Sequence, residues 1–173
     1  FSVDEIEILV NMPNSKTKNG FRNYVLLLFM YETAARAQEI ADLTLKQIHF
    51  KDYSYVILKG KGNKERNIPI TEDLKEVLIK YIKIFHIEDQ DDYIFKNKNN
   101  NKITTKGIEY ILKKYIEEAR IKYPNKFKDN FSNHSMRHSR AMHLLEAGVN
   151  LIYIRDILGH KSVITTEIYA KTN

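Results

Sequence analysis

The sequence predicts an α+β fold that is mainly helical and carries a small antiparallel three-stranded sheet at one edge. Apolar residues recur at helical spacing in the first and last thirds of the chain, which predicts amphipathic helices there. Between them, two β-rich segments at 53–58 and 66–70 flank a glycine-bearing turn, which predicts a β-hairpin. We expect one domain over residues 1–173, because no Pro/Gly/Ser-rich linker divides the chain.

Three helices are expected in the N-terminal third of the chain. The first covers about 2–11, where Ser2 and Glu5 have the spacing of a capping box. The second covers about 17–33 and turns its apolar residues inward. The third begins near Ala37.

The hairpin turn lies between Lys59 and Lys64 and has the sequence KGKGNK. Its two glycines favour a tight turn with a mobile tip. Helices are expected to follow at about 71–85 and 105–119, and residues 93–95 are expected to form the third strand.

The C-terminal third is expected to be helical again, at about 133–147 and 151–158. Each of these helices is followed by a glycine, Gly148 or Gly159, which suits the left-handed residue that commonly ends a helix. A last short helix or turn is expected at 165–170.

Charge and composition favour a nucleic-acid partner. The net charge is +6 and the pI is near 9.3, which favours a polyanion, although lysine-rich composition alone can give the same values. No apolar run approaches the roughly 18 residues of a membrane span, so we expect no membrane partner. The absence of cysteine fits a reducing compartment, and the first ten residues lack the features of a secretory signal. We therefore expect a cytoplasmic protein.

Two short motifs in the first half of the chain contain candidate functional cations. Arg36 is followed three residues later by Glu39, which is close enough to orient the guanidinium, although such pairs are usually structural. Lys61 lies between two glycines, so that its side chain can reach a ligand. The GKG segment lacks the GxxxxGK[ST] pattern, and nucleotide binding of the P-loop type is not expected.

Two further motifs lie near the C-terminus. His134 and Arg137 are three residues apart on one helix face and can point at one ligand. His138 would add a second histidine at i+4, but a single pair without an HExxH glutamate is a weak zinc motif, so no metal is expected. His160 follows Leu-Gly, and Tyr169 comes nine residues after it.

Taken together, these motifs resemble the tyrosine recombinase (phage integrase) family, which includes Xer-type recombinases and integrases of mobile elements. The family shows T-G-L-R-x-x-E-L, G-K-G-x-K-x-R, H-x-x-R and L-G-H in this order, with a tyrosine nine residues after the last histidine. The matching segments here are TAARAQEI, GKGNKER, HSMR and LGHKSVITTEIY. The resemblance extends over nearly the whole chain.

The resemblance implies the DNA breaking-rejoining fold and site-specific recombination, for integration or excision, without a cofactor. A tyrosine attacks the phosphodiester, which leaves a 3′-phosphotyrosyl link and a free 5′-hydroxyl. The implied catalytic residues are the nucleophile Tyr169, the phosphate-binding Arg36 and Arg137, the general acid Lys61, the proton acceptor His134 and the hydrogen-bond donor His160. Glu39 is implied as a residue that orients the others.

The implied partner is double-stranded DNA, bound by a homotetramer in the synaptic complex, whereas the isolated domain is expected to be monomeric. DNA contacts are expected from Arg36, Lys61, Lys64, Arg66, Arg137 and Arg140. The core-binding domain that precedes this region in the family is expected to be missing, and the chain ends four residues after Tyr169.

One departure and two alternatives accompany the resemblance. Ala34 and Ala35 stand where the family usually has Gly and Leu, which could alter the turn before Arg36. One alternative is an inactivated relative that only binds DNA, and the intact set of motif residues argues against it. The other is a type IB topoisomerase, and the spacing and the GKGNKER hairpin favour the recombinase.

Overall fold

The computed structural model describes residues 1–159, so the expected turn at 165–170 lies outside the described residues. The fold is mainly helical with one small antiparallel sheet, as predicted. The helices in the described part are α1 (Val3–Val10), α2 (Lys18–Thr33), α3 (Ala37–Ala41), α4 (Glu72–Ile84), α5 (Thr105–Lys122), α6 (Asn133–Glu146) and α7 (Leu151–Leu158). Two single-turn 3₁₀ helices occupy Leu45–Gln47 and Lys61–Asn63.

Local sequence signals account for most helix ends. The Ser2 hydroxyl accepts a hydrogen bond from the Glu5 N–H, and the Glu5 carboxylate accepts one from the Ser2 N–H, both at 3.1 Å. This confirms the predicted capping box. Thr17 and Thr71 cap α2 and α4 through their side-chain oxygens, without the return hydrogen bond of a capping box. After α6, Gly148 has φ of +88°, a left-handed conformation that suits glycine.

The sheet has the order β1-β2-β3, with strands Ile48–His49, Tyr55–Lys59 and Glu65–Pro69. The antiparallel pair β2–β3 confirms the β-hairpin predicted from segments 53–58 and 66–70. The prediction of a third strand at 93–95 is wrong, because β1 takes that place and Tyr93 forms only an isolated bridge with Thr44.

The apolar character of 93–95 comes from burial in the core instead of strand pairing. Ile94 and Phe95 are consecutive residues, and both are almost completely buried. A strand with one solvated face would bury only every second residue.

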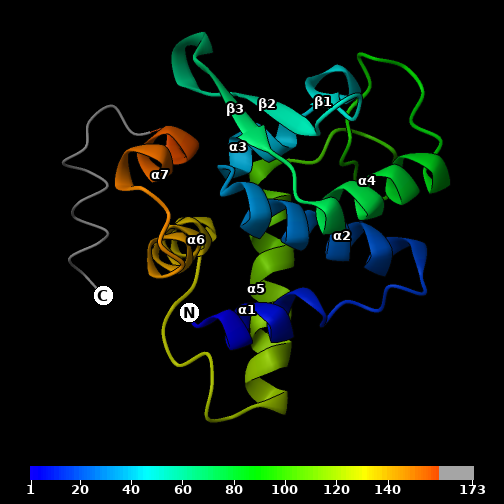
Figure 1. Cartoon of the computed structure of the whole chain (residues 1–173). Coiled ribbons are helices and arrows are strands. Elements are labelled where there is room, and N and C mark those ends of the chain that lie inside the picture. Colours follow the sequence, from blue (N-terminus) through cyan, green and yellow to red (C-terminus); the bar gives the residue numbers. More distant parts are fainter. Residues whose placement is uncertain (160–173) are drawn as a thin grey trace.

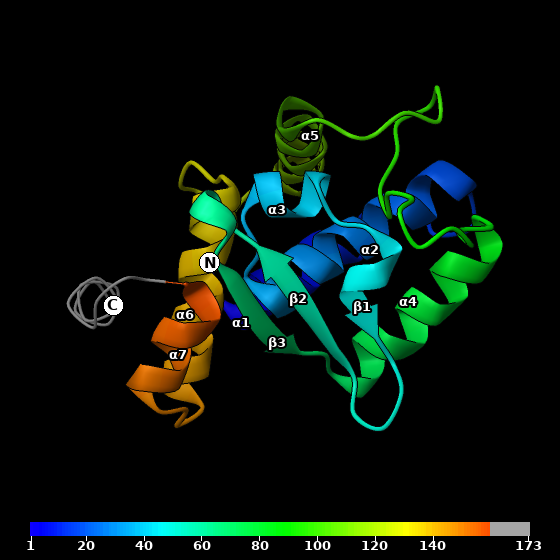
Figure 2. The ribbon, with the colours of Figure 1, turned by 90° about the horizontal axis from the view of Figure 1, so that it is seen from above.

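Helix α2 lies at the centre of the core and packs against α1, α4 and α6, while α3 and α1 pack against α5. Val25, Leu26, Leu27, Phe29 and Met30 of α2 are all fully buried, as expected for a helix that is covered on every side. Figures 1 and 2 show α6 and α7 together on one side of the molecule and α4 on the opposite side. The sheet lies over α3 and the end of α2, so its hairpin tip is on the side of α7.

Within residues 1–159, no helix is both long enough and apolar enough to span a bilayer.

Replacing Leu112 by alanine should lower the free energy of unfolding by about 2–5 kcal/mol, because its side chain is fully buried on α5 and the truncation leaves a cavity. Tyr110 lies on the same helix and is 70% exposed, so Tyr110→Ala should change stability by no more than about 0.5 kcal/mol. Urea unfolding of both variants checks this. Equal effects would contradict the packing described for α5.

Candidate active site

The turn between α2 and α3 places Arg36. Helix α2 ends at Ala34, whose φ of 55° and ψ of 27° are left-handed. The Thr33 hydroxyl donates to the Phe29 carbonyl at 2.7 Å and accepts from the Ala35 N–H at 3.2 Å, which fixes the chain on both sides of Ala34. An alanine in this conformation costs roughly 1–2 kcal/mol, a cost that glycine avoids. The departure from the family motif therefore keeps the turn and adds backbone strain.

Asn133, the first residue of α6, holds the same turn from the other side. Its Nδ2 donates to the Ala35 carbonyl at 3.0 Å, and its Oδ1 accepts from the Ala37 N–H at 3.1 Å. A carboxamide offers a donor and an acceptor together, so one side chain bonds the backbone before and after Arg36. Asn133 belongs to none of the motifs that predicted the site, and its only signal in the sequence is its position directly before His134.

Glu39 binds Arg36 through the backbone. Its Oε1 accepts from the Arg36 N–H at 2.8 Å, and its carboxylate forms a two-pronged ion pair with the guanidinium of Arg66, with Nη2–Oε1 at 3.0 Å. The side chains of Glu39 and Arg66 are 3% and 8% exposed. The carboxylate expected to orient the Arg36 guanidinium is thus used by Arg66.

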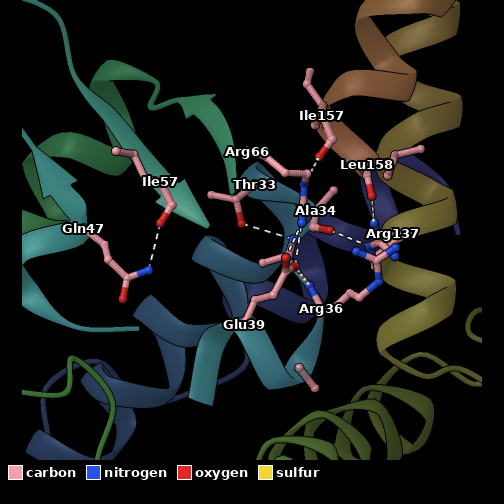
Figure 3. A network of polar contacts seen from close by, with 12 residues as sticks. Thr33, Ala34, Arg36, Glu39, Gln47, Ile57, Arg66, Arg137, Ile157 and Leu158 are labelled. Atoms are coloured by element: carbon pink, nitrogen blue, oxygen red, sulfur yellow. Dashed lines mark hydrogen bonds and ion pairs between the residues drawn. The ribbon is translucent and has the colours of Figure 1, made fainter. Parts of the chain in front are cut away.

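The guanidinium of Arg36 has no ion pair or hydrogen bond among residues 1–159. Arg36 is half-buried at the start of α3. In the view of Figure 3 its side chain runs toward Arg137. A cation whose nearby carboxylate is already paired remains available to an external anion.

Arg137 is the buried member of the site, at 5% exposure. Its Nε donates to the Ala34 carbonyl at 2.6 Å, and its Nη2 donates to the Leu158 carbonyl. Arg137 therefore connects the turn before Arg36 with the end of α7 (Figure 3). His134 lies one helical turn before Arg137, and its side chain is exposed.

The C-terminal end of α7 is held by two arginines. Arg137 binds the Leu158 carbonyl, and Arg66 Nε donates to the Ile157 carbonyl at 2.8 Å. The last carbonyls of a helix lack partners within the helix and carry partial negative charge, so cations stabilise them.

Gly159 ends α7 with φ of +71°, and a Cβ there would lie 2.6 Å from Cδ of Arg66. Both the backbone conformation and the lack of space require glycine, which explains the glycine of the LGH motif. His160 and Tyr169 lie outside the described residues.

The predicted general acid Lys61 lies at the exposed tip of the hairpin. The Gly60 N–H donates to the Lys64 carbonyl at 2.8 Å and closes the turn, and Gly62 has φ of +73°. Lys61 and Lys64 are both exposed, and the tip lies on the side of the molecule that carries α7 (Figure 1).

Two of the arginines expected to contact DNA form ion pairs within the protein, and their DNA contacts stay a prediction. Arg66 is paired with Glu39, as described above. Arg140 is 19% exposed, lies 3.3 Å from the Glu32 carboxylate and stacks over the ring of Tyr31. The charge of each arginine is therefore compensated by a carboxylate within the protein.

Comparisons with known proteins agree on one family. The family described as "Phage integrase family" matches residues 1–173. Tyrosine recombinase XerC of Lacticaseibacillus casei is 35% identical over 171 residues, which cover 95% of this chain and 55% of that protein. Tyrosine recombinase XerD of Halalkalibacterium halodurans is 33% identical over 173 residues, which cover 97% of this chain and 55% of that protein. The chain thus spans just over half the length of these relatives.

Solved structures of tyrosine recombinases share the fold. The crystal structure of XerA recombinase has a TM-score of 0.82 at 24% identity and covers 98% of this chain and 58% of that one. XerH bound to palindromic difH substrate in a post-cleavage complex has a TM-score of 0.83 at 22% identity, covering 99% of this chain and 49% of that one. The mainly helical fold with its small sheet is therefore that of the tyrosine recombinase catalytic domain.

Replacing Glu39 by glutamine should lower the free energy of unfolding by about 3–5 kcal/mol, because it leaves the charge of buried Arg66 uncompensated. Chemical unfolding followed by circular dichroism measures this loss.

The matched control is Asp91→Asn, which removes a carboxylate from an exposed pair with Lys46. It should leave stability unchanged, because solvent screens such pairs. If the two variants unfold alike, the Glu39–Arg66 pair does not stabilise the site.

Proposed function

Because the chain belongs to the phage integrase family, we propose that it catalyses site-specific DNA recombination by cutting and rejoining strands through a covalent tyrosine intermediate. The observation that carries this proposal is the arrangement of Arg36 and Arg137. The side chains of Arg36 and Arg137 lie at one turn, and the carboxylate of Glu39, three residues after Arg36, is paired with a third arginine, Arg66. Such a site is built to receive an anion.

A phosphodiester resists attack because its oxygens are negatively charged. Without a metal, cations must stabilise the charge that builds on the non-bridging oxygens in the transition state. Arginine suits this role, since its planar fork matches two phosphate oxygens and it stays charged. Arg36 binds the phosphate from its fixed turn, and Arg137 adds charge from a buried position that it cannot leave without breaking its backbone bonds.

The chemistry then needs a nucleophile, a proton acceptor and a proton donor. The phenol oxygen of Tyr169 attacks phosphorus, its proton passes to His134, and the bond to the 5′-oxygen breaks. Lys61 donates a proton to the leaving 5′-oxygen from the hairpin tip, and His160 donates a hydrogen bond to the phosphate. The phosphotyrosyl link conserves the energy of the phosphodiester, so the attack of a 5′-hydroxyl rejoins the strand without a cofactor.

The proposed partner is double-stranded DNA, and residues 1–173 serve as the catalytic domain. The solved relatives include XerH with its difH substrate and the Tn1549 transposon integrase with circular intermediate DNA. By analogy, four copies of the protein assemble in the synaptic complex, and Lys64 contacts the DNA backbone beside Lys61. Integration or excision is the outcome of paired strand exchanges.

Tyr169→Phe should abolish the covalent protein–DNA adduct, because phenylalanine has no oxygen to attack phosphorus. The measurement is adduct formation by the full-length protein on a nicked suicide substrate, analysed on a denaturing gel. An adduct that persists in Tyr169→Phe would exclude this tyrosine as the nucleophile. Relaxation of supercoiled DNA that needs no specific site would indicate a topoisomerase instead.

Arg36→Ala should slow adduct formation at least about 100-fold, the scale of losing one donor to a developing oxyanion. Its melting temperature should stay close to that of the wild type, because the Arg36 guanidinium has no bonding partner in the described part of the chain. Arg137→Ala should lose both adduct formation and stability, since it also removes two bonds to backbone carbonyls. Wild-type cleavage by Arg36→Ala would overturn the proposed arginine pair.

A further inference from the structure

A cavity lies at the opposite end of α2 from Arg36. This cavity, of about 320 Å³, opens between the start of α2, the end of α4 and the loop that contains residues 94–100. Figures 1 and 2 both show these three segments side by side. The 16 residues of α2 span about 24 Å, so this cavity is separate from the proposed active site.

The lining of this cavity is strongly cationic. It includes Lys18, Arg22, Lys96 and Lys98, and no aspartate or glutamate. Lys96 is neutralised by Asp92 at 2.8 Å. The other three cations have no ion pair in the described part of the chain, so the cavity carries an excess positive charge.

Arg22 is the strongest indication of a ligand, because it is a buried charge that has no counter-ion among residues 1–159. Arg22 is 9% exposed, and burial lowers the pKa of its guanidinium group. Asn23 Oδ1 accepts from Nε and Nη2 at 3.0 and 2.7 Å, and the Lys96 carbonyl accepts from Nη1 at 2.9 Å. These acceptors are all neutral, and a guanidinium has five N–H groups. Two N–H groups and the full charge remain for an anion.

The rest of the lining combines three asparagines, Asn19, Asn97 and Asn100, with an apolar and aromatic part. Tyr81, Phe85, Ile87 and Ile94 contribute to it, and the Tyr81 and Phe85 rings stack at 4.5 Å between centroids. Lys18 Nζ lies 5.5 Å from the centre of the Phe85 ring, which places a cation directly beside the apolar surface. The volume is at the lower end of that of small-molecule pockets and exceeds what a bare phosphate needs.

We propose that this cavity binds a small organic phosphate of the size of a nucleoside monophosphate, with the phosphate on Arg22, Lys18 and Lys98 and the ring on the apolar lining. The positive end of the α2 dipole adds a favourable partial charge near the phosphate. The residues that line this cavity have no part in the proposed recombination chemistry. Binding here can therefore be tested independently of the proposed function.

Isothermal titration of the full-length protein with AMP tests the proposal, with adenosine and inorganic phosphate as partial ligands. AMP should bind more tightly than either fragment. Lys18→Glu and Lys98→Glu should each weaken AMP binding at least tenfold, because both lysines are exposed and their replacement leaves the core intact. Arg22→Lys should weaken it further, with folding verified by circular dichroism.

The matched control is Lys113→Glu on the exposed face of α5, which makes the same charge change away from the cavity and should leave AMP binding unchanged. The proposal is overturned by absence of AMP binding at millimolar concentration, by equal loss in Lys113→Glu, or by adenosine binding as tightly as AMP. Displacement of AMP by a short DNA duplex would also overturn it, since the cavity would then be part of the DNA-binding surface. Loss of adduct formation in Tyr169→Phe is measured separately and bears only on the recombination chemistry.

Discussion

The end of α7 is held by arginines from two other elements, and the arrangement of the site depends on this contact. Helix α7 has eight residues, too few to be stable alone, so its position must come from tertiary contacts. Arg66 and Arg137 supply them by binding two consecutive carbonyls that the helix itself leaves without partners. The position of Gly159, at the end of α7, is therefore fixed jointly by β3 and α6.

A single carboxylate distinguishes the ion-paired Arg66 from Arg36, the arginine proposed to bind phosphate. The Glu39 carboxylate forms an ion pair with the Arg66 guanidinium, whereas from Arg36 it accepts only a backbone hydrogen bond. The two neighbouring arginines therefore have different environments. With the opposite pairing, Arg66 would be a buried unpaired charge and Arg36 would be neutralised before any phosphate arrived. Burial of the Glu39–Arg66 pair strengthens this division, because water cannot screen the pair or compete for it.

Features set by neighbouring residues were predictable from the sequence, whereas those set by distant partners were not. The capping box at Ser2 and the hairpin turn at Gly60 follow from local spacing, and the motif residues could be recognised by their order. The inward direction of the Arg66 side chain was also predictable, because the strand period places it on the same face as buried Ile68. Asn133 and the cationic cavity could not be found, since their partners come from separate segments of the chain.

The anchoring of Arg66 has a consequence for the timing of the proposed reaction. At the base of the hairpin, Arg66 forms an ion pair with Glu39 of α3 and a hydrogen bond with Ile157 of α7. Within the described residues, no such side-chain interaction holds the exposed tip, which contains Lys61 and Gly62. In the proposed reaction, contacts with DNA would fix the position of this tip and would offset the conformational entropy that the tip loses. Proton donation by Lys61, as proposed above, would then depend on bound substrate.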